Sequence, residues 1–311
     1  IVLVLIGIKI AIYQENGANV LVSFITIGIP SLYIVSLPFS KDEFLKICYK
    51  LAIINFFLIF WMPVARVNIS YMRFGYGMSP MTVFLYCYIK HEKDISTKRK
   101  IAAILVLFMS VIEIVFFGAR GSLLPIIIFV AIDILLLSKI NLKIVIPFLL
   151  GLIGYLNAET IINYAIDFLG GFGLRSYALL KFRMQLARGI EEASSGRFAR
   201  YLTAFDRIKQ NLVLGSDLIG GLNDDYTHNF FLQITEEFGI FALILSVIFL
   251  AYCVYCMGNK KRSIDNRLIL SVFFSLSMGR LLFSSSYWLR PEFWILIGFE
   301  LTCFGARLVR K

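Results

Sequence analysis

The sequence predicts an all-α integral membrane protein, and three observations support this fold class. Hydrophobic residues make up 59% of the 311 residues and charged residues only 16%, which is more apolar surface than a soluble core of this size could bury. The mean hydropathy is +0.80. The hydrophobic residues are also concentrated in long runs, and the one long hydrophilic stretch among them is 158–227.

Each apolar run is a candidate membrane helix, because crossing a hydrocarbon core of about 30 Å takes roughly 20 apolar residues, and shorter runs suffice where neighbours pack around them. About ten transmembrane helices are expected. Because the chain begins at Ile1, inside an apolar run and without Met, we expect that one or more helices precede it. The ten runs are 1–13, 20–39, 46–62, 78–90, 101–118, 121–138, 143–157, 229–256, 268–286 and 291–306.

Charges in the short loops predict the orientation, because Lys and Arg gather on the cytoplasmic side. With ten alternating helices, the basic connections and the basic C-terminus fall on one side, so both termini are inside. The segment 158–227 then lies outside, between an N-terminal bundle, 1–157, and C-terminal helices, 228–311. The residues assigned to the inside are Lys41, Lys46, Lys50, Lys90, Lys93, Lys98, Arg99, Lys100, Lys139, Lys143, Lys260, Lys261, Arg262, Arg267, Arg307, Arg310 and Lys311.

The net charge of +11 is therefore mostly a topology signal. A nucleic-acid partner is not expected, because no soluble domain with a basic face and base-reading elements is present. The five Cys lie in or beside apolar runs, which is no disulfide framework. Cys253 and Cys256 stand three apart on one predicted helix without a second ligand pair, so they are interpreted as packing residues and not as a metal site.

The external loop is expected to be mostly helical. In 174–190, apolar residues recur at helical spacing with Arg and Lys on other faces, which describes a basic amphipathic helix suited to an anionic lipid surface. A second helix follows Ser194-Ser195-Gly196, and Arg197, Arg200 and Arg207 share one of its faces. This face could hold a diphosphate. The alternative is a solvated face or contact with lipid headgroups.

His228 stands where the external loop ends and the next apolar run begins. Asn229, Gln233 and Glu237 follow at steps of four and form one polar stripe, which either binds a polar ligand or cross-links helices by hydrogen bonds. For Glu237 the structural role is favoured, with Arg280 as its partner, because an intramembrane charge needs one.

Two other features receive structural interpretations. Tyr287, Trp288 and Trp294 are interpreted as an interfacial aromatic belt rather than a platform for sugars. His91 stands among charged residues and is interpreted as an ordinary solvated side chain.

Several short segments follow one another in an informative order: Ser195-Gly196-Arg197, Asn211-Leu212-Val213-Leu214-Gly215, His228-Asn229-Phe230-Phe231-Leu232-Gln233 and Glu237-Phe238-Gly239-Ile240. They resemble the signature region of the bacterial O-antigen polymerase and ligase superfamily. Upstream, Phe117-Gly118-Ala119-Arg120-Gly121-Ser122 resembles the superfamily's Ser-Arg-Gly turn at the outer end of a helix. Ala119 replaces the usual Ser, and Leu212 stands where Pro commonly follows the Asn. The resemblance, detailed over about 117–245, implies a GT-C-like glycosyltransferase that needs no metal and uses a lipid-linked sugar at the outer face.

The residues fit that chemistry. Outside the cytoplasm the donor would be a sugar on a polyprenyl diphosphate, whose leaving group is a diphosphate. Arg120 and Arg197 are the candidates for stabilising it, because guanidinium stays charged and forks onto phosphate oxygens; for Arg120 the alternative is snorkelling to the headgroups. The outer segments hold no Asp-x-Asp for a divalent ion, so neither metal nor cofactor is expected.

His228 is the candidate general base, since imidazole has a reference pKa of about 6.5 and an attacking sugar hydroxyl must lose its proton. Orienting the acceptor or binding phosphate are its alternative roles. The residues expected to bind substrate around it are Arg200, Arg207, Asn229, Gln233, Glu237 and Arg280.

We therefore expect a multi-pass protein of the bacterial inner (plasma) membrane that polymerises O-antigen or capsule repeats on polyprenyl diphosphate, with its site facing the periplasm or outside. The expected partners are lipid-linked oligosaccharides as donor and acceptor, membrane lipids and a chain-length regulator protein. The alternative enzyme is a ligase that transfers the finished glycan to lipid A core or another acceptor. The alternative of another class is a polysaccharide-lipid transporter, but no convincing internal repeat of the kind such proteins have is evident.

Overall fold

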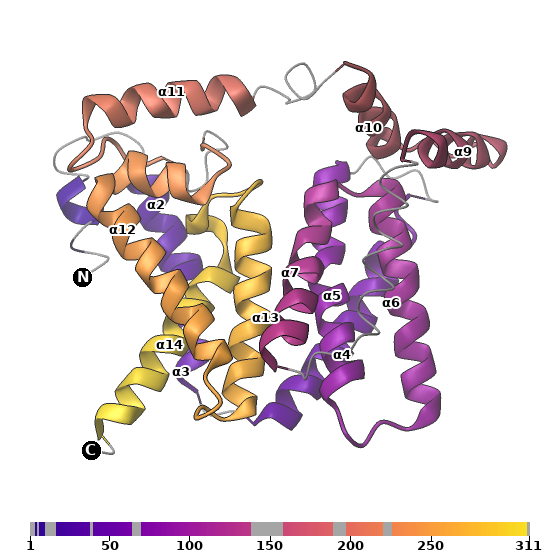
Figure 1. Cartoon of the computed structure of the whole chain (residues 1–311), viewed down its shortest axis with the longest axis horizontal. Helices are drawn as coiled ribbons and strands as arrows, with labels where there is room; N and C mark the ends of the chain where they lie inside the picture. Colours follow the sequence, from indigo (N-terminus) through magenta and orange to yellow (C-terminus); the bar gives the residue numbers. More distant parts are fainter. Residues whose placement is uncertain are drawn as a thin grey trace. The chain divides into compact units, whose positions relative to one another are not determined.

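The protein is helical throughout the part described by a computed structural model, which comprises residues 4, 6–9, 17–37, 40–63, 70–137, 158–188, 197–219 and 226–309. Every regular element in these residues is a helix (Figure 1). Three of these helices are long and apolar enough to cross a membrane: Gly17–Ser36, Thr97–Phe117 and Phe230–Gly258. The all-α class is thus confirmed for the described residues, and their three long apolar helices are consistent with a membrane protein, whereas the number of ten spans stays a prediction.

The remaining predicted apolar runs do not all form long apolar helices in the structure. The runs 46–62, 78–90, 268–286 and 291–306 are helical, but their helices include charged residues. The run 121–138 corresponds to a shorter apolar helix, Gly121–Leu137. The run 143–157 and part of 1–13 lie outside the described residues.

The chain divides into two compact units, Ile1–Phe39 with Gly196–Lys311, and Ser40–Ser195. This division differs from the predicted three-part organisation, because the helices of the external loop belong to different units. Helices α9 (Ala158–Gly171) and α10 (Tyr177–Arg188) pack within the second unit, and α11 (Arg197–Gln210) packs against α12 (Phe230–Gly258) in the first.

In the first unit, α11 lies across the end at which α12 begins (Figure 1). Helix α12 packs on α13 (Ile264–Leu281), and α13 packs on α14 (Pro291–Val309). A nearly continuous helix, interrupted by one π-helical turn, covers α14. It consists of α2 (Gly17–Ser23), η1 (Phe24–Gly28) and α3 (Ile29–Ser36).

Aromatic side chains form the core of the first unit. Trp288 packs on Tyr287 and Trp294 with ring centroids 4.7 Å and 5.8 Å apart, and Phe24 meets Trp294 at 5.0 Å. The interpretation of Tyr287, Trp288 and Trp294 as an interfacial belt is therefore wrong. Their side chains are at most 4% exposed, so they stabilise the contact between helices instead of facing lipid headgroups.

In the second unit, α5 (Tyr71–His91) is the central helix and packs on α4 (Lys41–Ile59), α6 (Thr97–Phe117) and α7 (Leu124–Ile132). Serine side chains begin its helices: Ser40, Ser70 and Ser96 each accept a hydrogen bond from the backbone N–H three residues later. Such caps accept hydrogen bonds from backbone N–H groups that have no partner within the first turn of a helix. The short η2 (Arg120–Leu123) precedes α7, and a π-helical segment, η3 (Asp133–Leu137), follows it.

His91 is not an ordinary solvated residue. Its Nε2 lies 2.9 Å from Oδ1 of Asp133, and the Tyr86 hydroxyl donates to Oδ2 of the same carboxylate at 3.2 Å. The side chain of Asp133 is 1% exposed, and a carboxylate so deeply buried needs such partners. Tertiary contact with η3, which the local sequence does not reveal, thus leaves the side chain of His91 only 14% exposed.

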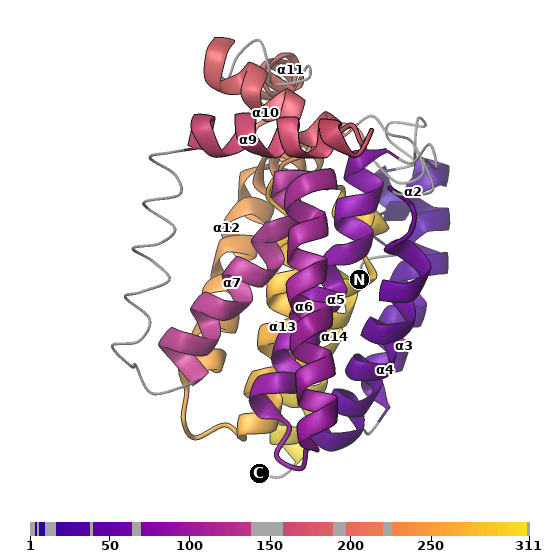
Figure 2. The same ribbon diagram turned by 90° about the vertical axis from the view of Figure 1, so that its right-hand side faces the viewer.

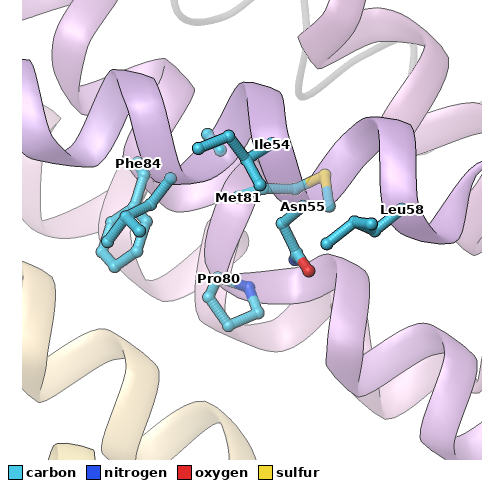
Figure 3. A pocket seen from close by; sticks show the side chains of 8 residues that line it. Ile54, Asn55, Leu58, Pro80, Met81 and Phe84 are labelled. Atoms are coloured by element: carbon cyan, nitrogen blue, oxygen red, sulfur yellow. The ribbon is translucent and has the colours of Figure 1, made fainter.

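A groove of about 260 Å³ lies between α4 and α5 (Figure 3). Its walls are apolar except for Asn55, whose Nδ2 donates to the carbonyl of Gly77 at 2.9 Å. Pro80 lacks an N–H and so disrupts the hydrogen bonds of the preceding turn of α5; Asn55 supplies a donor to that turn. The groove offers one amide and no charged group, and it is not the candidate catalytic site.

Candidate functional site

Residues singled out in the sequence meet at a cleft of about 190 Å³ in the first unit, between α11 and the start of α12. The cleft is lined on one side by α11, which contributes both Arg200 and Arg207 because seven residues are close to two helical turns. Its complete lining is Ala199, Arg200, Thr203, Arg207, Ile219, Tyr226, Thr227 and Glu236.

His228 adjoins this cleft in an unusual backbone conformation. Its φ is 55°, and among the described residues no other non-glycine has a positive φ. His tolerates this left-handed region better than most residues do, yet the conformation is still costly, and such strain is often found at functional sites. Asn229, the next residue, is extended and begins α12. His228 therefore forms the turn that immediately precedes the first residues of α12.

The imidazole of His228 contacts two residues at the edge of the cleft. Its Nε2 lies 3.2 Å from Nη1 of Arg200, and its ring centroid lies 4.4 Å from that of Tyr226. Nη1 of Arg200 also donates to the carbonyl of Tyr226 at 3.3 Å. A guanidinium has donors only, so Nε2 must accept in this contact, and its lone pair is then occupied by Arg200.

Arg207 forms an ion pair on the same side of the cleft. Its Nη1 lies 3.0 Å from Oε1 of Glu236, whose side chain is 2% exposed, whereas that of Arg207 is 47% exposed. The prediction singled out Glu237 and missed Glu236. Adjacent residues of a helix point about 100° apart, so only one of the two acids can face α11, and the sequence alone does not indicate which.

Two of the segments that resemble the superfamily signature, 211–215 and 237–240, pack against each other. The segment 211–216 crosses α12 where Gly239, with φ 79° and ψ −173°, interrupts the helix. The N–H of Ile240 donates to the carbonyl of Leu212 at 2.8 Å. A Cβ at Gly239 would overlap the carbonyl of Val213, so a residue with a side chain does not fit there.

Gly215 makes the reciprocal contact. Its φ is 71°, and a Cβ on it would lie 2.5 Å from the backbone of Glu237. The N–H of Ser216 donates to the carbonyl of Glu236 at 2.7 Å. Nζ of Lys9 donates to the carbonyls on either side of Gly215, both at 2.8 Å. The segment after α11 is thereby fixed to the helix that carries Glu236.

Gln233 and Glu237 are fully buried in a hydrogen-bond network. Nε2 of Gln233 donates to Oε1 of Glu237, to the carbonyl of Ile219 and to Oγ of Ser286, each at 2.8 Å. The N–H of Ile219 donates to Oε1 of Glu237 at 3.1 Å. These contacts favour the cross-linking role for the polar stripe.

Aromatic donors complete the surroundings of the Glu237 carboxylate. Nε1 of Trp288 donates to its Oε2 at 3.0 Å, and the Tyr287 hydroxyl donates to the same oxygen. Among the described residues, its hydrogen bonds do not include one from Arg280. The expected pair of Glu237 and Arg280 is therefore replaced by uncharged donors.

Asn229 has a structural role at the start of α12. Its Oδ1 accepts from the N–H of Leu232 at 3.1 Å, and its Nδ2 donates to the carbonyl of Leu282 at 3.4 Å. The first contact is a helix cap, and the second ties α12 to the end of α13. Both contacts support the turn that presents His228.

Arg120 belongs to the second unit and is the first residue of η2. The turn before it packs closely on α5: a Cβ on Gly118 would lie 3.0 Å from Cα of Gly75, and the N–H of Ala119 donates to the carbonyl of Tyr71 at 3.1 Å. The turn that resembles the superfamily is thus fixed at the backbone. Arg197 is the first residue of α11; the side chains of Arg120 and Arg197 lie outside what the structure describes.

No protein-family model, curated protein or solved structure matches the chain.

Proposed function

We propose that the protein is a membrane glycosyltransferase that polymerises polysaccharide repeats carried on polyprenyl diphosphate at the outer face of the bacterial inner (plasma) membrane. One observation carries the proposal: the contact of Nη1 of Arg200 with Nε2 of His228, 3.2 Å apart beside a cleft. The contact joins a guanidinium, which can bind phosphate, to an imidazole, which can accept a proton, and this supports a transfer that needs both groups.

The reaction joins an acceptor hydroxyl to the anomeric carbon of the donor glycan. The hydroxyl oxygen attacks that carbon, the bond from the carbon to the diphosphate oxygen breaks, and the lipid diphosphate leaves with the bonding electron pair. The hydroxyl proton passes to Nε2 of His228. Guanidinium groups stabilise the charge on the leaving diphosphate, which is the role proposed for Arg197, with Arg200 and Arg207 binding the same group.

The contact between Arg200 and His228 makes donor binding precede proton transfer to the base. While Arg200 donates to Nε2, the lone pair of the base is occupied. When a diphosphate enters, its oxygens are stronger acceptors than imidazole, so Arg200 turns to them and releases Nε2. The base then becomes available when the donor is bound, and Asn229 holds the turn in place through its helix cap.

Transfer of synthetic lipid-linked repeats by the purified full chain tests the proposal, with products resolved by length and His228→Asn as the matched control. A ladder of products that the control lacks supports the polymerase. Transfer of one preassembled glycan to lipid A core, without a ladder, supports a ligase instead. If folded protein forms neither product from any supplied acceptor, the transferase proposal fails, and movement of intact lipid-linked glycan across vesicles would then indicate transport.

A further inference from the structure

Helix α9 has two apolar faces, and only one packs against protein in the described part of the chain. Ile162 and Leu169 are 4% and 7% exposed and form a hydrophobic cluster with residues at the end of α6 and in α10, among them Phe116, Phe117 and Phe182. This face attaches α9 to the helices of its unit.

The second apolar face is aromatic and exposed. Ile161, Tyr164, Phe168 and Phe172 are 51%, 74%, 63% and 69% exposed. Ile161, Tyr164 and Phe168 stand at steps of three and four, so the helical periodicity places them in one stripe, and Phe172 follows in the turn after the last residue of α9. Phe168 and Phe172 contact each other edge to face, with ring centroids 5.1 Å apart. A surface with three aromatic rings is costly to leave in water.

A third face of α9 is polar. Glu159, Asn163 and Asp167 follow at steps of four and form their own stripe, and both acids are exposed. The helix therefore presents one side to protein, one apolar side and one side suited to water. Such a three-sided pattern is expected for a helix that lies in a membrane interface at the margin of a bundle.

The position of α9 in its unit agrees with that pattern. It lies across the end of the helix bundle and not parallel to it (Figure 2). The bundle includes α6, which is long and apolar enough to span a membrane, and the cluster under α9 contains Phe116 and Phe117 from the last turn of α6. A helix that crosses the end of a spanning helix lies at the depth of the lipid headgroups, where aromatic side chains are enriched.

Helix α10 turns part of its predicted apolar face toward protein. Leu179 and Phe182 pack into the cluster with α6 and α9, so these apolar residues of α10 contact protein. Arg175 and Arg183 remain exposed beside α9. Their charge suits the anionic headgroups of a bacterial membrane.

We propose that α9 is an interfacial anchor, whose stripe of Ile161, Tyr164 and Phe168, with Phe172 after it, inserts into lipid at the end of the bundle. The polar stripe faces water, and the exposed arginines beside α9 contact anionic headgroups. The proposal does not rest on glycosyl transfer.

Site-directed spin labelling tests the proposal in the full chain reconstituted into vesicles of phosphatidylethanolamine and phosphatidylglycerol. Nitroxides are placed by Cys substitution at Tyr164, Phe168 and Phe172, with Asn163 and Asp167 as matched controls on the same helix. The five native cysteines are buried or half-buried, so the unsubstituted protein serves as the labelling blank. Each label's collision rate is measured with oxygen, which concentrates in lipid, and with a water-soluble nickel chelate.

The expected result is a ratio of oxygen to nickel collisions that is several-fold higher at Tyr164→Cys, Phe168→Cys and Phe172→Cys than at the two controls, with label depths of about 5–10 Å below the headgroups. Equal ratios at both sets would mean that the aromatic stripe faces water and would overturn the proposal. Immobilised labels that collide with neither reagent would overturn it as well, because the stripe would then be covered by protein.

Discussion

Nη1 of Arg200 lies 3.2 Å from Nε2 of His228, and a fixed positive charge at that position disfavours protonation of the imidazole. If His228 is the base, activity is lost at low pH as the imidazole becomes protonated. Replacing Arg200 by Ala removes the charge, so protonation occurs at higher pH. We expect the acidic limb of the pH–rate profile to move to higher pH in Arg200→Ala, and much less in Arg200→Lys.

Chemical modification gives a readout of the same contact that does not depend on activity. The chain contains two His, so diethylpyrocarbonate modification can be assigned by mass spectrometry, with His91, which is paired with Asp133, as the internal reference. We expect His228 to react faster in Arg200→Ala than in the wild type at the same pH. An unchanged rate would show that Arg200 does not occupy Nε2.

The role of His228 can be separated from its backbone strain. A residue with a side chain pays about 1–3 kcal/mol at a φ of 55°, and Asn, like His, tolerates this conformation better than Ala does. Since losing a positioned base costs about 10²- to 10⁴-fold, His228→Asn should lose activity on that scale with little change in stability. His228→Ala should lose both activity and stability. Polymerisation by His228→Asn at the wild-type rate would remove His228 from the mechanism.

The interlock of segment 211–216 with α12 predicts a large effect from two small substitutions. Gly215→Ala and Gly239→Ala each place a Cβ at a positive φ, which costs about 1–3 kcal/mol before the overlap with the facing backbone is counted. We expect a clear drop in the unfolding temperature in detergent. Gly170→Ala is the control, because nothing lies within 4 Å of its Cβ; a drop as large in the control would contradict the explanation.

Two exposed lysines test the predicted orientation. Lys209 in α11 and Lys261 in the connection after α12 have the same side chain and are both exposed. In intact spheroplasts, an impermeant thiol reagent should label Lys209→Cys and not Lys261→Cys, with both labelled after the membrane is opened. The reverse pattern would place the cleft in the cytoplasm and remove the argument for a lipid-linked donor.

The electrostatic role of the arginines predicts how activity responds to chelators and to charge-preserving substitutions. If Arg197 stabilises the leaving diphosphate, turnover should survive exhaustive chelation. Lys keeps the charge but loses the planar fork, so the activity of Arg197→Lys should fall between those of the wild type and Arg197→Ala. Activity that chelation abolishes and magnesium restores would assign this role to a metal ion.

Several features of the fold followed from local sequence. The apolar runs predicted helices, and the Ser and Asn residues before them begin helices as caps. The sequence pattern indicates the segments around Arg200, His228 and Glu237 as a candidate site, and Arg200 and His228 do lie together. The proposed activity and the orientation stay predictions.

Other features depended on contacts between segments distant in sequence. The sequence alone determined that the chain is apolar and helical, because periodicity and hydropathy are properties of neighbouring residues. Only the tertiary structure decided that Glu236 and not Glu237 faces Arg207, that Trp288 is core, that His91 is paired and that one apolar face of α9 is exposed. Each of these depends on which side of a helix another helix covers, and a polar or aromatic residue has the same local pattern whether the surface opposite it is lipid, water or protein.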